Sequence, residues 1–477
     1  MTEASPQRAN MGFIGAIVAV ATIGGFLFGY DSGAVNGTQD GLSQAFGLVK
    51  GSWSPTNGLG FTVASLLIGC FIGAFFAGRL ADLVGRRNTM IFAAILFLAG
   101  ALVQGLAEAH IVFVIARICG GMAVGAASVL SPAYISEVAP AEIRGRLTTV
   151  QQIMIITGLT VAFIVNKLLQ VAAGSSLDRF WLGFEAWRWM YLMQALPAVI
   201  FLVALFFIPE SPRYLVSKGR QDKAEGVLAS LFGSGVARAK LEEIRATFSA
   251  DHRPRLSDIR SPAGGIRKVV WAGIMLAAFQ QFVGINVIFY YGATLWQLAG
   301  FTEAQSLLIN IGSGAVSIAA CLGTIAVIDK IGRKPILLIG SAGMAVTLFT
   351  MVYAFSHGSL DPTDPSKLVL SKDLGILAVV AANFYVIFFN FSWGPVMWVM
   401  LGEMFPNQIR GSALAVSGFV QWFANFLISF SFPVMAAKLG LALSYSFYAV
   451  CAVISFFLVQ KLVHETRGVE LEQMSGH

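Results

Sequence analysis

The sequence predicts an all-α membrane protein with twelve transmembrane helices in two six-helix halves, joined by a cytoplasmic helical linker. Its 477 residues are 56% hydrophobic and only 12% charged, whereas soluble domains carry about 25% charged residues. Twelve apolar stretches have the length of about 20 residues that crosses a ~30 Å hydrocarbon core as a helix. Three charged motifs of the first half recur, in the same order, in the second half.

The expected spans form two sets of six. The first set covers residues 11–35, 57–80, 89–108, 111–136, 147–171 and 189–209. The second set covers residues 269–297, 303–328, 335–356, 374–402, 410–434 and 440–462. Between them lies a basic, polar stretch typical of short amphipathic helices. The predicted units are an N-terminal bundle, linker helices, a C-terminal bundle and a cytoplasmic tail, at residues 1–210, 211–268, 269–464 and 465–477.

The distribution of Lys and Arg predicts that both termini are cytoplasmic. In that orientation 24 of the 32 basic residues lie on the cytoplasmic side, seven lie outside and Arg117 lies within a span. Cytoplasmic loops carry the excess of Lys and Arg in membrane proteins. Topology therefore explains the net charge of +7, and we expect a multi-pass protein of the cell (inner) membrane without a nucleic-acid partner.

The recurring motifs indicate an internal duplication. "GRLADLVGRRNTM" at 78–90 matches "TIAVIDKIGRKPI" at 324–336, each directly after the second span of its half. "EVAPAEIRG" follows the fourth span and "EMFPNQIRG" the tenth, while "PESPR" and "HETRG" close the sixth and twelfth. Two parallel repeats related by an axis along the membrane normal are typical of a transporter whose site lies between the halves.

The duplicated motifs place acids and bases together at cytoplasmic helix ends. A single ion pair at a wet surface is weak, but a network of several can favour one conformation of a two-state protein and release it in the other. The alternative is that the bases only fix the topology. We favour a cytoplasmic gate made of Asp82, Arg86, Arg87, Glu137, Arg144, Glu210, Arg213, Asp329, Arg333, Glu403, Arg410, Glu465 and Arg467.

Two charged residues lie well inside the predicted spans, Asp31 in the first and Arg117 in the fourth. Intramembrane charges are costly and usually functional. Both residues are expected towards the outer ends of their spans, so they can share a depth and pair, which offsets the desolvation cost of each. We interpret the pair as a proton switch, and a static structural ion pair is the alternative.

The second half has many amide side chains in its spans. Amides both donate and accept hydrogen bonds, which suits a neutral polyol, and nearby aromatic rings offer flat faces for a sugar ring. Gly284 lies between Gln281 and Asn286 and allows the helix to distort towards a cavity. The alternative role of such amides is to join helices, which we expect for Asn383, Asn390 and Asn425. Pro395 is expected to break the tenth span and give it a hinge, and a simple kink is the alternative.

The whole chain resembles the sugar porters of the major facilitator superfamily. The resemblance rests on "GRLADLVGRR", "PESPRYL", "QQFVGINVIFYY", "DKIGRKP" and "WGPVMWVMLGEMFPNQIRG", and it covers residues 20–475 almost without interruption. It is strongest to bacterial proton-linked xylose and hexose carriers, with mammalian facilitative glucose transporters as more distant relatives. In the proton-coupled members the residues that correspond to Asp31 and Arg117 carry out the coupling.

The resemblance also implies a set of sugar contacts: Gln152, Gln280, Gln281, Asn286, Gly394, Trp398, Gln421 and Trp422. Three positions depart from relatives. Ser317 replaces an Asn common in the eighth span, and Leu159 replaces a Gln of the xylose symporter, which favours a hexose. Gln194 stands where bacterial xylose symporters have a second acid in the sixth span, so coupling is expected to be simpler here.

These observations predict a monosaccharide–proton symporter, for a hexose or pentose of the D-glucose or D-xylose type, that works by alternating access as a monomer. The main alternative is a facilitative uniporter in which Asp31 and Arg117 form a structural pair. A non-transporting sugar sensor and a drug–proton antiporter are less favoured, the latter because of the amide-rich second half. We expect no enzyme, cofactor or metal site, because the sequence has no phosphate-binding loop and its Cys and His residues are scattered.

Overall fold

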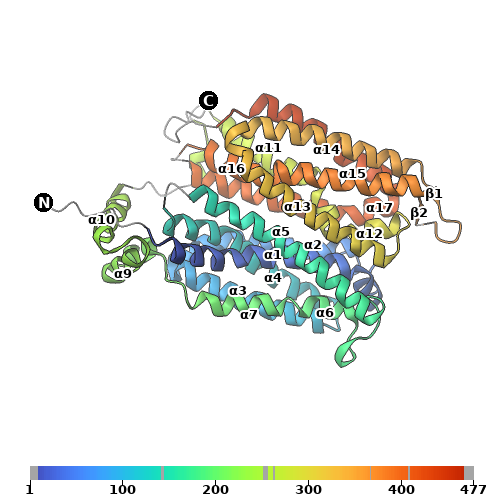
Figure 1. The fold of residues 1–477 in the computed structure, drawn as a ribbon, viewed down its shortest axis with the longest axis horizontal. Coiled ribbons are helices and arrows are strands. Elements are labelled where there is room, and N and C mark those ends of the chain that lie inside the picture. Colours follow the sequence, from blue (N-terminus) through green and yellow to red (C-terminus); the bar gives the residue numbers. More distant parts are fainter. Residues whose placement is uncertain are drawn as a thin grey trace.

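The chain folds into long helices that form two groups, one from each half of the sequence (Figure 1). The computed structural model describes residues 9–140, 144–250, 256–261, 264–365, 367–406 and 409–466. In Figure 1 the helices of the first half, from blue to green, lie beside those of the second half, from yellow to red. The predicted class, an all-α membrane protein with a helical linker, is confirmed.

The first half contributes six spans. These are α1 (Met11–Phe46), α2 (Leu59–Val84), α3 (Arg86–Leu106), α4 (His110–Val138), α5 (Arg144–Ala173) and a sixth span built from α6 (Ala186–Leu192) and α7 (Ala195–Leu205). A short 3-10 turn, η2 (Trp181–Gly183), precedes α6.

The linker forms short helices at one end of the bundle (Figure 1). They are α8 (Pro212–Ser217), α9 (Gln221–Phe232), α10 (Ser234–Ala250) and the 3-10 helix η3 (Leu256–Ile259). The amphipathic pattern is explained by packing, because Ala224, Leu228 and Leu231 of α9 are buried whereas its polar residues are largely exposed. We call this end of the molecule the linker end and the opposite one the far end.

The second half contributes six more spans. They are formed by α11 (Lys268–Phe282) with α12 (Ile285–Leu298), by α13 (Glu303–Ile331) and α14 (Arg333–Ser356), by α15 (Lys372–Phe391) with α16 (Trp393–Met404), and by α17 (Arg410–Leu462). A two-stranded sheet of β1 (Ser359–Leu360) and β2 (Leu368–Val369) lies at the far end.

Helix α17 contains two spans. Its 53 residues would extend about 80 Å at 1.5 Å per residue, more than twice the hydrocarbon thickness. The backbone departs from helical geometry at Gly440, whose φ is +83°. The 11 apolar helical segments of membrane-spanning length in the described chain therefore provide twelve spans.

The first span is longer than predicted. We expected it to end at residue 35, but α1 continues to Phe46. The polar residues that follow position 35 belong to the helix, and Asn36 and Gln39 are buried because they bind the backbone of α12. Asp31 consequently lies near the middle of α1 and not near its outer end, which corrects the expected position.

Two spans of the second half are interrupted, and each interruption has a local cause. Pro395 lacks the N–H group that would bond to the Phe391 carbonyl, and the span breaks at Ser392 as the proline predicts. Thr324 Oγ1 donates to the released Phe391 oxygen at 2.7 Å. Gly284 adopts a φ of +85° between α11 and α12, a conformation that favours glycine.

Glycines allow α2 and α4 to pack with their backbones in contact. A Cβ atom at Gly121 would overlap the Leu66 carbonyl oxygen, and one at Gly125 would overlap that of Cys70. Gly69 and Gly73 of α2 face α4 in the same way. Small residues at such interfaces permit close helix association in membranes. The contact fixes the position of α4, and with it that of Arg117.

We predict that Gly121→Ala destabilises the folded protein by about 1–3 kcal/mol, the usual cost of overpacking, because the new methyl group meets backbone that cannot move aside. The melting temperature of the purified protein in detergent measures this effect. The matched control is Gly78→Ala in α2, where a Cβ meets nothing within 4 Å and the melting temperature should stay the same or rise. Equal melting temperatures for the two variants would contradict the packing argument.

Candidate functional site

A buried ion pair joins α1 to α4. Asp31 is 0% exposed and Arg117 is 1% exposed. The Nη2 atom of Arg117 lies 3.3 Å from Oδ2 of Asp31, and its Nη1 atom donates to Oδ1 at 3.4 Å. The structure thus brings together the two charged residues that the sequence singled out.

Three further groups complete this ion-pair cluster. Arg117 donates from Nη1 to Gln104 Oε1 and from Nη2 to the Val63 carbonyl, each at 3.2 Å. Gln194 Nε2 donates to Asp31 Oδ1 at 3.2 Å. Five elements of the first half therefore meet at one point. Sequence reasoning missed Gln104, although a polar residue in an otherwise apolar span was a signal that could have found it.

The cluster is electrostatically costly and depends on both charges. Burial removes several kcal/mol of hydration from each ion, and only close pairing with added hydrogen bonds compensates for that loss. If one charge is neutralised, the other is left without compensation. The arrangement can therefore hold these helices in one relative position while the pair is ionised, and release them when Asp31 takes up a proton.

A second group of polar side chains, the amide cluster, lies in the second half. Gln280 Nε2 donates to the Trp393 carbonyl at 3.0 Å and to the Gly394 carbonyl at 3.4 Å. Its own Oε1 accepts from Gln281 Nε2 at 3.3 Å and from Gln421 Nε2 at 3.4 Å. The cluster joins α11, α16 and α17.

The helix interruption at Gly284 brings Asn286 to this cluster. Asn286 and Gln281 are five residues apart, and Asn286 Nδ2 donates to Gln281 Oε1. The Val283 carbonyl, freed at the break, accepts from the Tyr385 hydroxyl at 2.6 Å. The distortion that the sequence predicted at Gly284 therefore turns the start of α12 back towards α11.

The remaining predicted sugar contacts lie outside this hydrogen-bond chain. Trp422 is buried on α17, and its ring packs edge-on against Phe28 of α1 at 5.3 Å between centroids. Gln152 is partly exposed on α5, and Trp398 is 40% exposed on α16. The structure therefore brings five of the eight predicted residues together, namely Gln280, Gln281, Asn286, Gly394 and Gln421.

Other amides of the second half hold helices together. Asn425 Nδ2 donates to the Tyr290 hydroxyl at 3.1 Å, and Asn390 Nδ2 donates to Ser317 Oγ at 3.2 Å. Asn383 Oδ1 accepts from Ser313 at 3.2 Å. These contacts agree with the structural role expected for the three asparagines.

The two halves are joined near the far end by Asn36 of α1. Its Nδ2 donates to the Phe289 carbonyl at 2.8 Å, and its Oδ1 accepts from the Ala293 N–H at 2.8 Å. Gln39 Nε2 adds a bond to the Tyr290 carbonyl at 2.5 Å. Asn36 is five residues from Asp31, about 7.5 Å along the helix. Helix α1 therefore carries the ion pair and also binds α12, which begins at the amide cluster.

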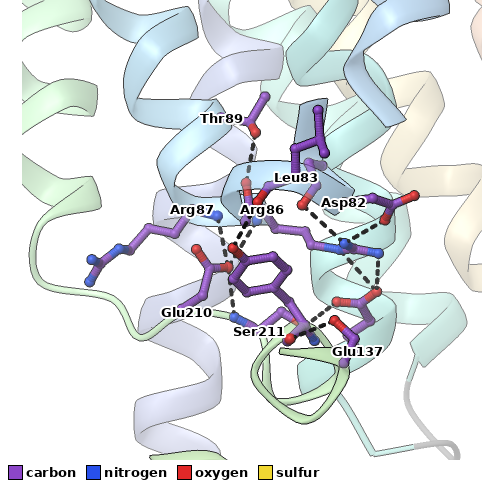
Figure 2. Close-up of polar contacts among 12 residues, drawn as sticks. Asp82, Leu83, Arg86, Arg87, Thr89, Glu137, Glu210 and Ser211 are labelled. Carbon is purple, nitrogen blue, oxygen red and sulfur yellow. Dashed lines mark hydrogen bonds and ion pairs between the residues drawn. The ribbon is translucent and has the colours of Figure 1, made fainter. Parts of the chain in front are cut away.

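Charged motifs of the first half form a network at the linker end (Figure 2). Arg86 Nη1 pairs with Asp82 at 2.8 Å and Nη2 pairs with Glu137 at 3.2 Å. Glu210 accepts the backbone N–H groups of Arg86 and Arg87 at 2.9 and 3.0 Å. A carboxylate in that position is stabilised by the N-terminal end of α3.

The second half repeats this network. Arg333 Nη2 pairs with Glu403 at 2.9 Å. Glu465 accepts the backbone N–H groups of Arg333 and Lys334 at 3.0 and 2.9 Å, at the start of α14. Ser211 and Thr466 hydrogen-bond Glu137 and Glu403 respectively. The duplication seen in the sequence is therefore a duplication of geometry.

The other predicted gate residues are placed less fully. Arg87 Nη1 donates to the Ile208 carbonyl at 3.1 Å, and Arg213 interacts electrostatically with Glu137. Arg467 lies outside the described residues, as do the side chains of Arg144, Asp329 and Arg410.

Comparison with known proteins finds sugar transporters that match almost the whole chain. Residues 17–476 match the family model described as sugar (and other) transporter. The chain is 46% identical to a glucose transport protein of Synechocystis over 98% of both chains, and 38% identical to the D-xylose-proton symporter of Escherichia coli K12 over 98% of this chain and 96% of that one.

Solved structures of the E. coli xylose transporter XylE are similar throughout. An inward-open structure has a TM-score of 0.80 at 37% identity, over 97% of this chain and 99% of that one. A structure bound to 6-bromo-6-deoxy-D-glucose has a TM-score of 0.77 at 37% identity, over 98% and 99%.

Proposed function

This chain belongs to the sugar porter family of the major facilitator superfamily, and on that premise we propose that it is a monosaccharide–proton symporter that works by alternating access. The family consists of transporters and not enzymes, and the chain is a multi-pass membrane protein. The relatives named for glucose and D-xylose support a hexose or pentose of these types as the substrate.

The observation that carries the proposal is the fully buried pair of Asp31 and Arg117. In the cycle that we propose, Asp31 takes up a proton from the outer side, which neutralises the carboxylate and frees it from Arg117. Gln104 and the Val63 carbonyl continue to hold the guanidinium. When the proton leaves to the cytoplasm, the pair forms again.

Helix α1 connects the protonation of Asp31 to the binding of sugar. A shift of α1 on protonation would loosen the bonds of Asn36 to α12, and Asn286 of the amide cluster lies on α12. We propose that this cluster binds the hydroxyl groups of the sugar, which exchange with the hydrogen bonds that the amides make to one another. Gln152, Trp398 and Trp422 would then complete the site as the halves move.

The two charged networks at the linker end are proposed to form the cytoplasmic gate. Each network lies within its own half, so it fixes the helix ends of that half as one unit. The excess of Lys and Arg at this end supports a cytoplasmic location for it and for both termini. We further propose that the protein lies in the cell (inner) membrane and functions as a monomer. We also propose that it consists of the N-terminal bundle, linker helices, C-terminal bundle and cytoplasmic tail predicted from the sequence.

We predict that Asp31→Asn abolishes sugar accumulation driven by a pH gradient, because an amide cannot gain and lose the proton. Counterflow exchange, which needs no net proton movement, should continue. Uptake and counterflow of labelled glucose and xylose in proteoliposomes, with and without the gradient, measure both activities.

Asp40→Asn serves as the control, since Asp40 lies on the same helix, nine residues after Asp31. The Asp40→Asn variant should still accumulate sugar. Continued accumulation by Asp31→Asn would show that the pair is structural and that the protein is a uniporter. Loss of exchange together with accumulation would also contradict a dedicated proton-coupling role.

We predict that Gln281→Ala weakens sugar binding about 3–10-fold, because the sugar loses one or two neutral hydrogen bonds to this amide. Inhibition of counterflow by unlabelled sugar gives the affinity. Gln305→Ala, at the exposed start of α13, is the matched control. Unchanged affinity in Gln281→Ala would remove this residue from the sugar site.

A further inference from the structure

Gln194 lies at an interruption of the sixth span, and the interruption aims its side chain at Asp31. Pro197 has no N–H group for the Met193 carbonyl, and that carbonyl instead accepts from Leu196 at 3.3 Å. Helix α6 therefore ends at Leu192 and α7 begins at Ala195. The turn between them buries Gln194 completely, with Nε2 at 3.2 Å from Asp31 Oδ1.

One side of this amide is unused. Gln194 Oε1 is buried and has no hydrogen-bond partner among the described residues. A buried polar atom without a partner is costly, and this oxygen is available to accept a hydrogen bond. The buried Asp31 Oδ2 atom likewise accepts no hydrogen bond there and has only its contact with the Arg117 charge.

The two sides of the amide suit the two charge states of Asp31. The ionised carboxylate only accepts hydrogen bonds, and Gln194 Nε2 donates to it. A protonated carboxyl group has an O–H that needs an acceptor, and a turn of the amide about its broad terminal torsion presents Oε1 to it. The other acceptors of the ion-pair cluster, Gln104 Oε1 and the Val63 carbonyl, already bind Arg117.

We propose, on the basis of the proposed function, that Gln194 is a positioning residue for proton coupling that hydrogen-bonds Asp31 in both of its charge states. Nε2 binds the empty carboxylate while Arg117 is paired with it. After a proton from the outer side binds the carboxylate, Oε1 accepts the new O–H and holds the neutral side chain as Arg117 separates. Release of the proton to the cytoplasm reverses both steps.

The other titratable groups that face Asp31 are few in the described part of the chain. They are Arg117 from α4, Cys70 from α2, Tyr191 from α6 and Tyr290 from α12. Of these, Arg117 is the cation, and the others are neutral at ordinary pH. A change in the pH profile on substitution of Gln194 is therefore expected to arise at Asp31.

The test is the pH profile of sugar uptake by Gln194→Met, which keeps the length of the side chain and removes both hydrogen-bonding atoms. A bond to a charged acceptor is stronger than one to a neutral group. Loss of the hydrogen bond from Gln194 therefore destabilises the ionised form of Asp31 more than the protonated form. The pH of half-maximal uptake should rise by about one unit. Gln194→Glu should also raise it, because two adjacent carboxylates disfavour joint ionisation.

Gln170→Leu is the control for removal of a buried amide elsewhere in the first half, and its pH profile should match that of the unaltered protein. Reduced uptake at every pH with an unmoved midpoint in Gln194→Met and Gln194→Glu would overturn the inference and leave Gln194 a packing residue. If Gln194→Met does not fold, Gln194→Glu decides alone. Uptake by the unaltered protein that is independent of pH would instead contradict the proposed function itself.

Discussion

The first half of the molecule is organised around the cost of burying one carboxylate and one guanidinium. Asp31 and Arg117 have left water completely, and only their contact, together with Gln104, Gln194 and the Val63 carbonyl, offsets that loss. The close packing of α2 on α4 places the Val63 carbonyl within reach of Arg117. The interruption of the sixth span places Gln194 within reach of Asp31. Packing and electrostatics are therefore parts of one arrangement.

The two ends of the spans serve different purposes. At the linker end each half carries its own network of Arg, Glu and helix N-terminus, so the duplicated sequence produces two separately fixed sets of helix ends. Near the far end, Asn36 crosses from α1 to the backbone of α12 and joins the halves. This asymmetry is what a carrier needs if its halves rock about a site between them.

Much of this arrangement could be predicted, because the residues concerned are unusual for their surroundings. Asp31, Arg117 and the repeated motifs are charged in an apolar chain, and Gly284 and Pro395 mark their own helix breaks. The partners were harder to find. Asparagine is a residue type common in loops, and Asn36 is buried because α12 lies beside it. The sequence around Asn36 does not indicate that contact. Gln194 is visible in the sequence as a departure from relatives, but its contact with Asp31 depends on the turn before Pro197.

The most direct test of the central claim is the external pH when sugar is added to proteoliposomes that hold the unaltered protein in weakly buffered medium, with no gradient imposed. If Asp31 carries a proton inward with each sugar, the medium becomes alkaline as sugar enters, and a proton ionophore removes the change. Sugar entry with no change of pH would contradict the account and leave the ion pair as a structural element of a passive carrier.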